Sequence, residues 1–133
     1  MKLGMTGNRY RVSNEAQTKL IDFLNENKII EVHHGDCLGA DAVFHDICSN
    51  LKIKTIIHPP DQDNLRAFCR GDVILEAKKY LVRNKDIVNS TDALIAFPST
   101  KKEIIRSGTW STIRYAKKLN KKVIIIYPDG DVK

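Results

Sequence analysis

Long apolar runs are missing from this sequence of 133 residues. No stretch approaches the roughly 18 consecutive apolar residues that would cross a bilayer, so we expect no membrane partner. The opening segment Met1–Met5 is too short to be the apolar region of a signal peptide. The sequence therefore predicts a cytoplasmic protein.

Cysteine is also scarce. The three cysteines are Cys37, Cys48 and Cys69, and an odd number at wide spacing does not suggest a disulfide framework. His45 and Cys48 lie three residues apart on an expected helix, a spacing that can support a metal site. No second pair of ligands has a spacing typical of zinc sites. We therefore expect neither a metal nor another cofactor.

Aromatic residues make up only 7% of the chain. Proteins that bind single-stranded nucleic acid usually stack bases on aromatic rings. The candidates for such stacking are Tyr10, Phe68, Trp110 and Tyr115, and we expect Trp110 to pack in the core. The net charge of +6 nevertheless favours anionic partners, whether phosphates, nucleotides or nucleic acid.

The chain is long enough for one domain, residues 1–133, and it contains no repeats or low-complexity segments. Strand and helix patterns alternate along it. We expect strands at 2–5, 29–32, 53–58, 93–97 and 123–127 and helices at 14–27, 39–50, 73–88 and 108–119. Ser13 or Asn14 can cap the first helix. Residues 61–72 and 98–107 are expected to be irregular.

The expected strands read as continuous apolar runs, such as Val123–Ile126. Such runs are typical of a parallel sheet that is buried on both faces. We therefore predict an α/β fold, a single Rossmann-like domain of three layers with right-handed crossovers and strand order 3-2-1-4-5. In this order the connections change direction between strands 1 and 4, and ligands of open α/β sheets bind beyond the carboxyl ends of the strands at that point.

Glycines and small hydroxyl residues gather in the loops at this predicted edge. Glycine lets the backbone approach a ligand closely, and the first turn of a helix offers free N–H groups to an anion. Alternatively, the glycines only make tight turns between strands and helices. The candidate ligand-binding residues are Thr6, Gly7, Asn8, Arg9, Gly35, Asp36, Gly39, Asp41, Arg83, Asn84, Pro98, Ser99, Ser107, Gly108 and Thr109.

Several of these residues have two interpretations. Arg9 can hold a phosphate or carboxylate through two hydrogen bonds, or it can be a solvated loop residue. Arg83 and Asn84 can face the ligand or lie on an exposed helix face. Asp36 and Asp41 can accept hydrogen bonds from ribose hydroxyls. Alternatively, Asp36 braces its own loop and Asp41 stabilises the start of a helix.

Four segments carry a family resemblance. Gly7-Asn8-Arg9 is similar to a first-loop G-S-R, and 35–41 is similar to G-G-A-R-G-A-D. Arg83-Asn84, before Ile87, is similar to R-N-x-x-M, and 96–98 followed by Gly108-Thr109 is similar to A-F-P-G-G-x-G-T. In this order and spacing the chain resembles the SLOG superfamily, and within it the YspA-like group. Ser107–Thr109, with Thr112 and Ala116, also resembles a segment of the DprA proteins.

The resemblance implies a Rossmann-like domain that binds a nucleotide or a nucleotide-derived ligand on its carboxyl-end loops. It also implies self-association through helices, with Trp110 or Tyr80 as interface candidates. Homo-oligomerisation is therefore expected. The DprA likeness adds single-stranded DNA as a second alternative ligand.

The same superfamily includes the LOG phosphoribohydrolases, which implies cleavage of an N-glycosidic bond as the first alternative function. Arg83 matches an arginine of these enzymes, but the position of their glutamate falls on Thr112. Cleavage of this kind needs a carboxylate to stabilise or protonate the reacting centre. Glu103 in the neighbouring loop could replace it, and Asp36 and Asp41 are the other candidates. We therefore favour binding over catalysis.

Overall fold

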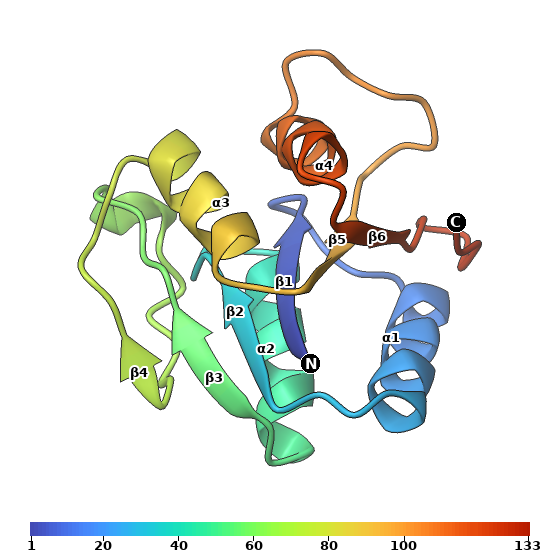
Figure 1. Ribbon diagram of the computed structural model, residues 1–133, viewed down its shortest axis with the longest axis horizontal. Helices are drawn as coiled ribbons and strands as arrows, with labels where there is room; N and C mark the ends of the chain where they lie inside the picture. Colours follow the sequence, from blue (N-terminus) through green and yellow to red (C-terminus); the bar gives the residue numbers. More distant parts are fainter.

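A six-stranded parallel sheet with helices on both faces forms the protein, and the computed structural model describes residues 1–133 (Figure 1). The prediction of a Rossmann-like α/β domain is therefore confirmed. The strands are β1 (Lys2–Gly7), β2 (Glu31–His34), β3 (Lys54–Ile57), β4 (Val73–Ile74), β5 (Ala93–Phe97) and β6 (Lys122–Ile125). The helices are α1 (Asn14–Glu26), α2 (Ala40–Asn50), α3 (Tyr80–Asn89) and α4 (Gly108–Lys118), with a short 3-10 helix at Asp63–Leu65.

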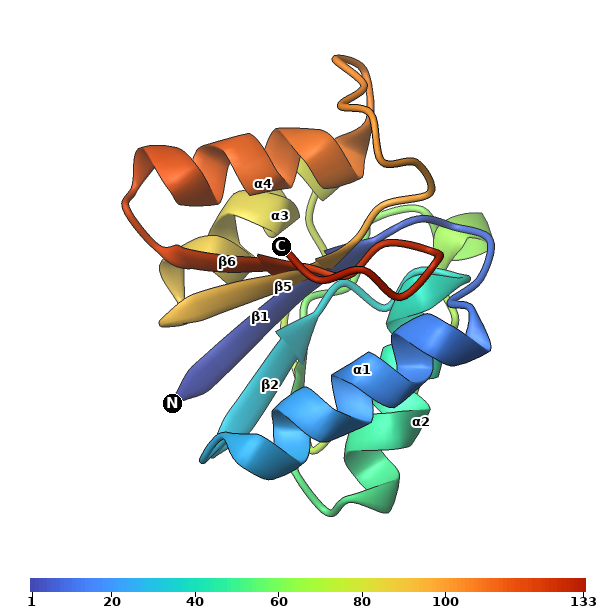
Figure 2. The same cartoon turned by 90° about the vertical axis from the view of Figure 1, so that its right-hand side faces the viewer.

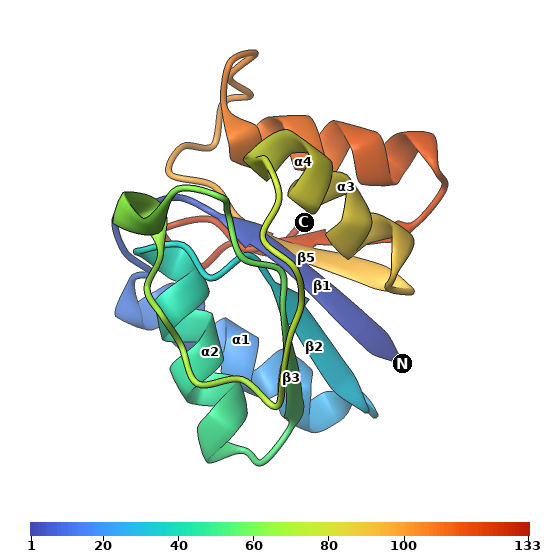
Figure 3. The same ribbon diagram turned by 90° about the vertical axis from the view of Figure 1, so that its left-hand side faces the viewer.

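The strand order is β4-β3-β2-β1-β5-β6, and every neighbouring pair is parallel. The five expected strands lie in the predicted order, and β4 adds a sixth at the edge. The prediction that Val73 and Ile74 begin a helix was wrong, because they pair with β3 instead. Asp72 accepts a hydrogen bond from the backbone N–H of Thr55 at 2.8 Å, which fastens this segment to β3. The segment runs along this edge of the sheet (Figure 3).

Two helices cover each face of the sheet: α1 and α2 on one side, α3 and α4 on the other (Figure 2). All five residues of β5 are buried. Ala93, Ile95 and Phe97 pack in the larger core with α1 and α2, whereas Leu94 and Ala96 face α3 and α4. Burial on both faces explains why the strands show no alternation of apolar and polar residues.

The two helices that begin near the carboxyl edge after β1 and β5 are both capped by serine. Ser13 Oγ accepts the N–H of Ala16 at 3.1 Å, which decides between the two candidate caps of α1. Ser107 Oγ accepts the N–H of Trp110 at 3.3 Å in the first turn of α4. Trp110 is buried against the sheet as expected. Leu119, the last residue of the predicted helix 108–119, is exposed and follows the end of α4 at Lys118.

Helix α3 begins at Tyr80, later than predicted. Its buried residues are Arg83, Ile87 and Val88, whereas Tyr80 and Leu81 are exposed. The first turn of α3 extends past the carboxyl ends of the neighbouring strands, where no sheet surface remains to cover it (Figure 1). None of the four helices is long and apolar enough to span a membrane.

Candidate functional site

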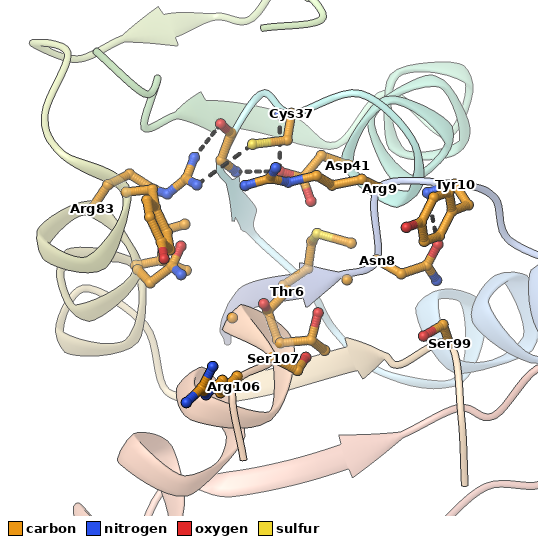
Figure 4. A pocket seen from close by; sticks show the side chains of 18 residues that line it. Thr6, Asn8, Arg9, Tyr10, Cys37, Asp41, Arg83, Ser99, Arg106 and Ser107 are labelled. Carbon is orange, nitrogen blue, oxygen red and sulfur yellow. Dashed lines mark hydrogen bonds between the residues drawn. The ribbon is translucent and has the colours of Figure 1, made fainter. Parts of the chain in front are cut away.

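A cavity of about 360 Å³ opens at the carboxyl ends of the strands, beside β1 and β5, where the connections change direction (Figure 4). This is the position that the topology of an open α/β sheet favours for a ligand. We call it the central cavity. Its lining residues are Met5, Thr6, Gly7, Asn8, Arg9, Tyr10, Gly35, Cys37, Asp41, Tyr80, Arg83, Asn84, Ile87, Ser99, Arg106, Ser107, Gly108 and Thr109.

The structure brings most of the candidate ligand-binding residues together around this cavity. Of the fifteen that the sequence suggested, all but Asp36, Gly39 and Pro98 line it. They come from five separate segments: the end of β1, the loop after β2, helix α3, the loop after β5 and the start of α4. Their convergence is a property of the fold, whereas their contact with a ligand stays a prediction.

Arg83 forms one wall of the central cavity from within the protein. Its side chain is only 5% exposed, so the alternative of an exposed helix face is excluded. Nη1 donates to the carbonyl oxygens of Gly35 and His58, and Nη2 lies 3.5 Å from Cys37 Sγ. The buried Nε has no hydrogen-bond partner. A buried guanidinium with an unpaired donor is an unusual and costly arrangement.

Asp41 is the only carboxylate that lines the central cavity. Its Oδ2 accepts the backbone N–H groups of Gly35 and Cys37, each at 3.1 Å. Oδ1 has no partner within the chain. Burial raises the pKa of Asp41 to about 6, although Arg83 and the two N–H donors act in the opposite direction. This carboxyl group therefore titrates near neutral pH and can both donate and accept a proton.

Cationic groups outnumber this carboxylate at the cavity. Arg9, Arg83 and Arg106 all line it, and none of them forms an ion pair with a carboxylate. The start of α4 faces the same space. The backbone N–H groups of Gly108 and Thr109 donate no hydrogen bond within the chain, as is usual in the first turn of a helix. Together these groups favour a ligand with negative charge.

Asn8 lines the cavity but uses its side chain to hold the loop. Its Nδ2 donates to the carbonyl of Phe97 at 3.0 Å. Its Oδ1 accepts the N–H groups of Tyr10 and Arg11 at 2.9 and 3.0 Å. Asn8 therefore fixes the loop after β1 against the end of β5, and it offers a ligand little hydrogen-bonding capacity of its own.

Asp36 does not reach the ligand space, so its proposed contact with a ribose was wrong. Its carboxylate is fully buried and accepts hydrogen bonds from Arg66 Nε at 3.0 Å and from the backbone N–H of Cys69 at 2.9 Å. The alternative interpretation therefore holds. Asp36 braces its own loop against residues 66–69, and its positive φ of 56° turns the chain there.

Gly39 and Pro98 also lie outside the central cavity. Gly39 has a φ of 90°, and a Cβ there would overlap the backbone of Arg9. Glycine is required because the two loops touch, and Ala40 N–H donates to Asn8 O at 2.9 Å beside it. Pro98 is buried and lines a neighbouring cavity instead. Both residues therefore shape the walls of the site from behind.

The sequence reasoning missed six lining residues: Met5, Tyr10, Cys37, Tyr80, Ile87 and Arg106. The sequence could have identified two of them. Tyr80 and Ile87 lie three and four residues from Arg83, so all three share one face of α3. Cys37 lies within the glycine segment. Burial is the largest influence on its thiol and raises the pKa of Cys37, which disfavours the thiolate needed for a nucleophile.

The alternative carboxylate candidate for the LOG-type reaction also lies elsewhere. Thr112 is buried, and its hydroxyl donates to the carbonyl of Gly108 at 2.8 Å. Glu103 pairs with Arg114 at 2.7 Å and does not line the central cavity. Only Asp41 remains as a carboxylate at the site.

A second group of titratable residues lies beneath the loop after β2. His34, His45 and Cys69 offer potential metal-ligand atoms within 4.8 Å of one another. Asp36 N–H donates to His34 Nδ1 at 3.0 Å, so a neutral His34 carries its proton on Nε2, which is 2.9 Å from His45 Nδ1. A metal on His34 Nε2 would need the proton on Nδ1 instead. The group therefore functions as a hydrogen-bonded support of the loop.

Comparison of the chain with known protein families, with curated proteins and with solved structures gives no match. The resemblance to the SLOG superfamily accordingly stays a prediction. The geometry and charge of the central cavity are therefore the basis on which a function is inferred.

Proposed function

We propose that the protein binds a small nucleotide or nucleotide-derived ligand in the central cavity. The observation that carries this proposal is the state of Arg83. Its guanidinium is buried, has no carboxylate partner and has an unpaired Nε. It lies in the wall of a cavity that the start of α4 also faces. A phosphate group would bond to the free N–H groups of Gly108 and Thr109 and neutralise the arginines. The volume of about 360 Å³ lies within the usual range for small-molecule sites.

Isothermal titration with AMP, GMP, CMP, UMP and ADP-ribose tests this proposal. We expect at least one compound to bind with a dissociation constant below 1 mM, the limit set by about −4 kcal/mol of binding free energy. Arg106→Ala should weaken that binding about fivefold or more, because it removes an exposed cation at the cavity. Lys118→Ala removes an exposed cation from the other end of α4 and should change nothing. Failure of every compound to bind the folded protein would refute the proposal.

Hydrolysis of an N-glycosidic bond is the second candidate function, and Asp41 is the observation that favours it. A carboxyl group with a pKa near 6 is suited to general acid–base catalysis at neutral pH. Water would add to the anomeric carbon of the ribose as the bond to the base breaks. Asp41 would protonate the leaving nitrogen, and the proton that the water loses would restore the Asp41 carboxyl group. Incubation with nucleoside monophosphates should then release free base, and Asp41→Asn should abolish release while it retains binding. No release from any monophosphate that binds would exclude this function.

Single-stranded nucleic acid is a weaker candidate ligand. Phe68 lies under the guanidinium of Arg66, 4.4 Å away, and the hydroxyl of Tyr115 donates to Asn89. Neither ring lines the central cavity, so an extended strand would find no row of stacking surfaces there. A gel shift at low salt that weakens steeply with added salt would favour this ligand over a small one.

We also propose that the chain forms homo-oligomers. Tyr80, Leu81 and Val82 are exposed on the first turn of α3, and Leu81 shares a surface recess with Tyr115 of α4. Trp110 is buried in the core and is not available for an interface. Light scattering coupled to size-exclusion chromatography measures the assembly, and Leu81→Glu should shift it towards monomer.

A further inference from the structure

A second cavity of about 380 Å³ adjoins the central one at the loop after β1. We call it the side cavity. Asn8, Tyr10 and Ser99 line both cavities, so the two spaces meet along these residues. The remaining wall is mixed: it includes the apolar Val12, Phe97 and Ile126 and the polar Arg11, Ser13 and Glu15. The edge of the sheet therefore offers a cationic space and, beside it, a space with both polar and apolar walls.

Tyr10 stands where the two cavities meet. Its side chain is 83% exposed, and its hydroxyl makes no hydrogen bond. The backbone beneath it is nevertheless well held, because Tyr10 N–H donates to Asn8 Oδ1 at 2.9 Å. A fixed backbone that presents an uncovered aromatic ring to solvent gains no packing energy from that ring. Such a ring is suited to stack against a flat ligand group.

Two of the three arginines of the central cavity, Arg83 and Arg106, lie across that cavity from Tyr10. Figure 4 shows Arg83 and Arg106 on one side of the central cavity and Tyr10 with Asn8 on the other. Tyr80, the other tyrosine of the central cavity, belongs to the cationic end, because its Cε2 lies 3.8 Å from the position that a Cβ on Gly108 would take. It does not line the side cavity.

We propose that Tyr10 is the base-stacking residue of the site and that the base of a nucleotide enters the side cavity while its phosphate lies at the start of α4. The inference depends on the proposed function and names its ligand more closely: a nucleoside phosphate whose ring system contributes to binding. The side cavity that the ring system would enter is lined by Tyr10 together with Val12, Phe97 and Ile126.

The test compares ribose 5-phosphate with the four nucleoside monophosphates, titrated calorimetrically into the wild-type protein and three variants. In the wild type we expect the best monophosphate to bind at least tenfold more tightly than ribose 5-phosphate. Tyr10→Ala should reduce this ratio by roughly 5- to 100-fold, the usual effect of removing one stacking ring, and Tyr10→Phe should retain it. Because Tyr10 is exposed, neither change should affect folding.

Tyr80→Ala is the matched control, since it removes a tyrosine ring from the cationic end. This variant should change the affinities for ribose 5-phosphate and for the nucleotide by the same factor. The ratio of the two affinities should therefore equal that of the wild type. An unchanged ratio in Tyr10→Ala, a ratio near one in the wild type, or loss of the ratio in Tyr80→Ala or Tyr10→Phe would each overturn the inference. A different result would refute the proposed function itself: neither a nucleoside monophosphate nor ribose 5-phosphate binds to the wild-type protein.

Discussion

Asp41 and Arg83 hold the same peptide segment from two directions. Asp41 Oδ2 accepts the backbone N–H of Gly35, and Arg83 Nη1 donates to the carbonyl oxygen of that residue. The two oppositely charged side chains thus meet across a glycine. A Cβ on Gly35 would collide with the guanidinium of Arg83 and lie 3.0 Å from Asp41 Oδ2. The absence of a side chain at this position sets the distance between the two groups.

Gly35→Ala should therefore disturb the site more than the fold. The added methyl group displaces the guanidinium of Arg83 and breaks its bond to Gly35, and a lost charged hydrogen bond corresponds to about 1.5–3 kcal/mol. We expect an affinity for the best nucleotide that is roughly tenfold lower or more by calorimetry, together with a lower melting temperature. Gly108→Ala is the control for folding, since a Cβ there meets nothing closer than 3.8 Å. Wild-type affinity for the nucleotide in Gly35→Ala would contradict the prediction.

Asp36→Asn should do the opposite: it should lower the stability of the fold and leave nucleotide affinity unchanged. The change removes the ion pair with Arg66, whose Nε lies 3.0 Å from Asp36 Oδ2, in a place where the carboxylate is fully buried. We expect unfolding in urea to show a loss of about 1–3 kcal/mol. Asparagine tolerates the positive φ of this position, so the backbone can keep its path. Nucleotide affinity below the unfolding transition should be unchanged, and a selective loss of affinity would return Asp36 to the ligand site.

The contrast between Asp36 and Asp41 shows how far sequence reasoning reaches. Apolar runs and their spacing were enough to predict the five main strands, their order and the edge at which a site would form. The same reasoning could not tell which of two aspartates in one loop faces the cavity, because that depends on the left-handed turn at Asp36. Val73 and Ile74 were assigned to a helix because two apolar residues fit either periodicity, and pairing with β3 decided the outcome.

Arg83 illustrates a second limit of what can be predicted from the sequence. Its position on α3 was predicted to face the same edge, but its burial depends on three partners from other segments: Gly35, Cys37 and His58. Long-range contacts of this kind leave no pattern in the sequence. Tyr10 was considered only for nucleic acid, because its exposure at the junction of two cavities appears only in the folded chain.

The buried histidines should make the protein sensitive to acid. Burial is the main cause that lowers the pKa of His34 to about 3 and that of His58 to about 4, from 6.5. The unfolded chain therefore takes up protons at these residues before the folded chain does. Their contribution to stability is complete above about pH 6.5 and is lost as the pH falls from there towards 4 and then 3. Each can add a slope of up to about 1.4 kcal/mol per pH unit.

Asp41 acts against this trend. Its folded pKa of about 6 lies above the 3.8 of an exposed aspartate, so its contribution to stability is present below about pH 3.8 and is lost as the pH rises through 6. One aspartate offsets only part of the effect of two histidines. We expect the free energy of unfolding in urea to fall between pH 6.5 and 4.5, and to fall more steeply in Asp41→Asn. Constant stability over this range in both proteins would contradict the assignment of buried neutral histidines.

Arg83→Lys should separate the charge of the cavity wall from its geometry. Lysine keeps the positive charge, but its ammonium lacks the planar guanidinium fork whose Nη1 donates to Gly35 and His58 and whose Nη2 reaches Cys37. We expect nucleotide affinity to drop by roughly tenfold or more and stability to fall by about 1–3 kcal/mol. Arg66→Lys is the matched control, because Arg66 also bonds to the segment after β2 but lies outside the central cavity. It should lower stability and leave affinity unchanged. If both variants bind the nucleotide as the wild type does, Arg83 supports only the fold and the ligand contacts must come from Arg9, Arg106 and the start of α4.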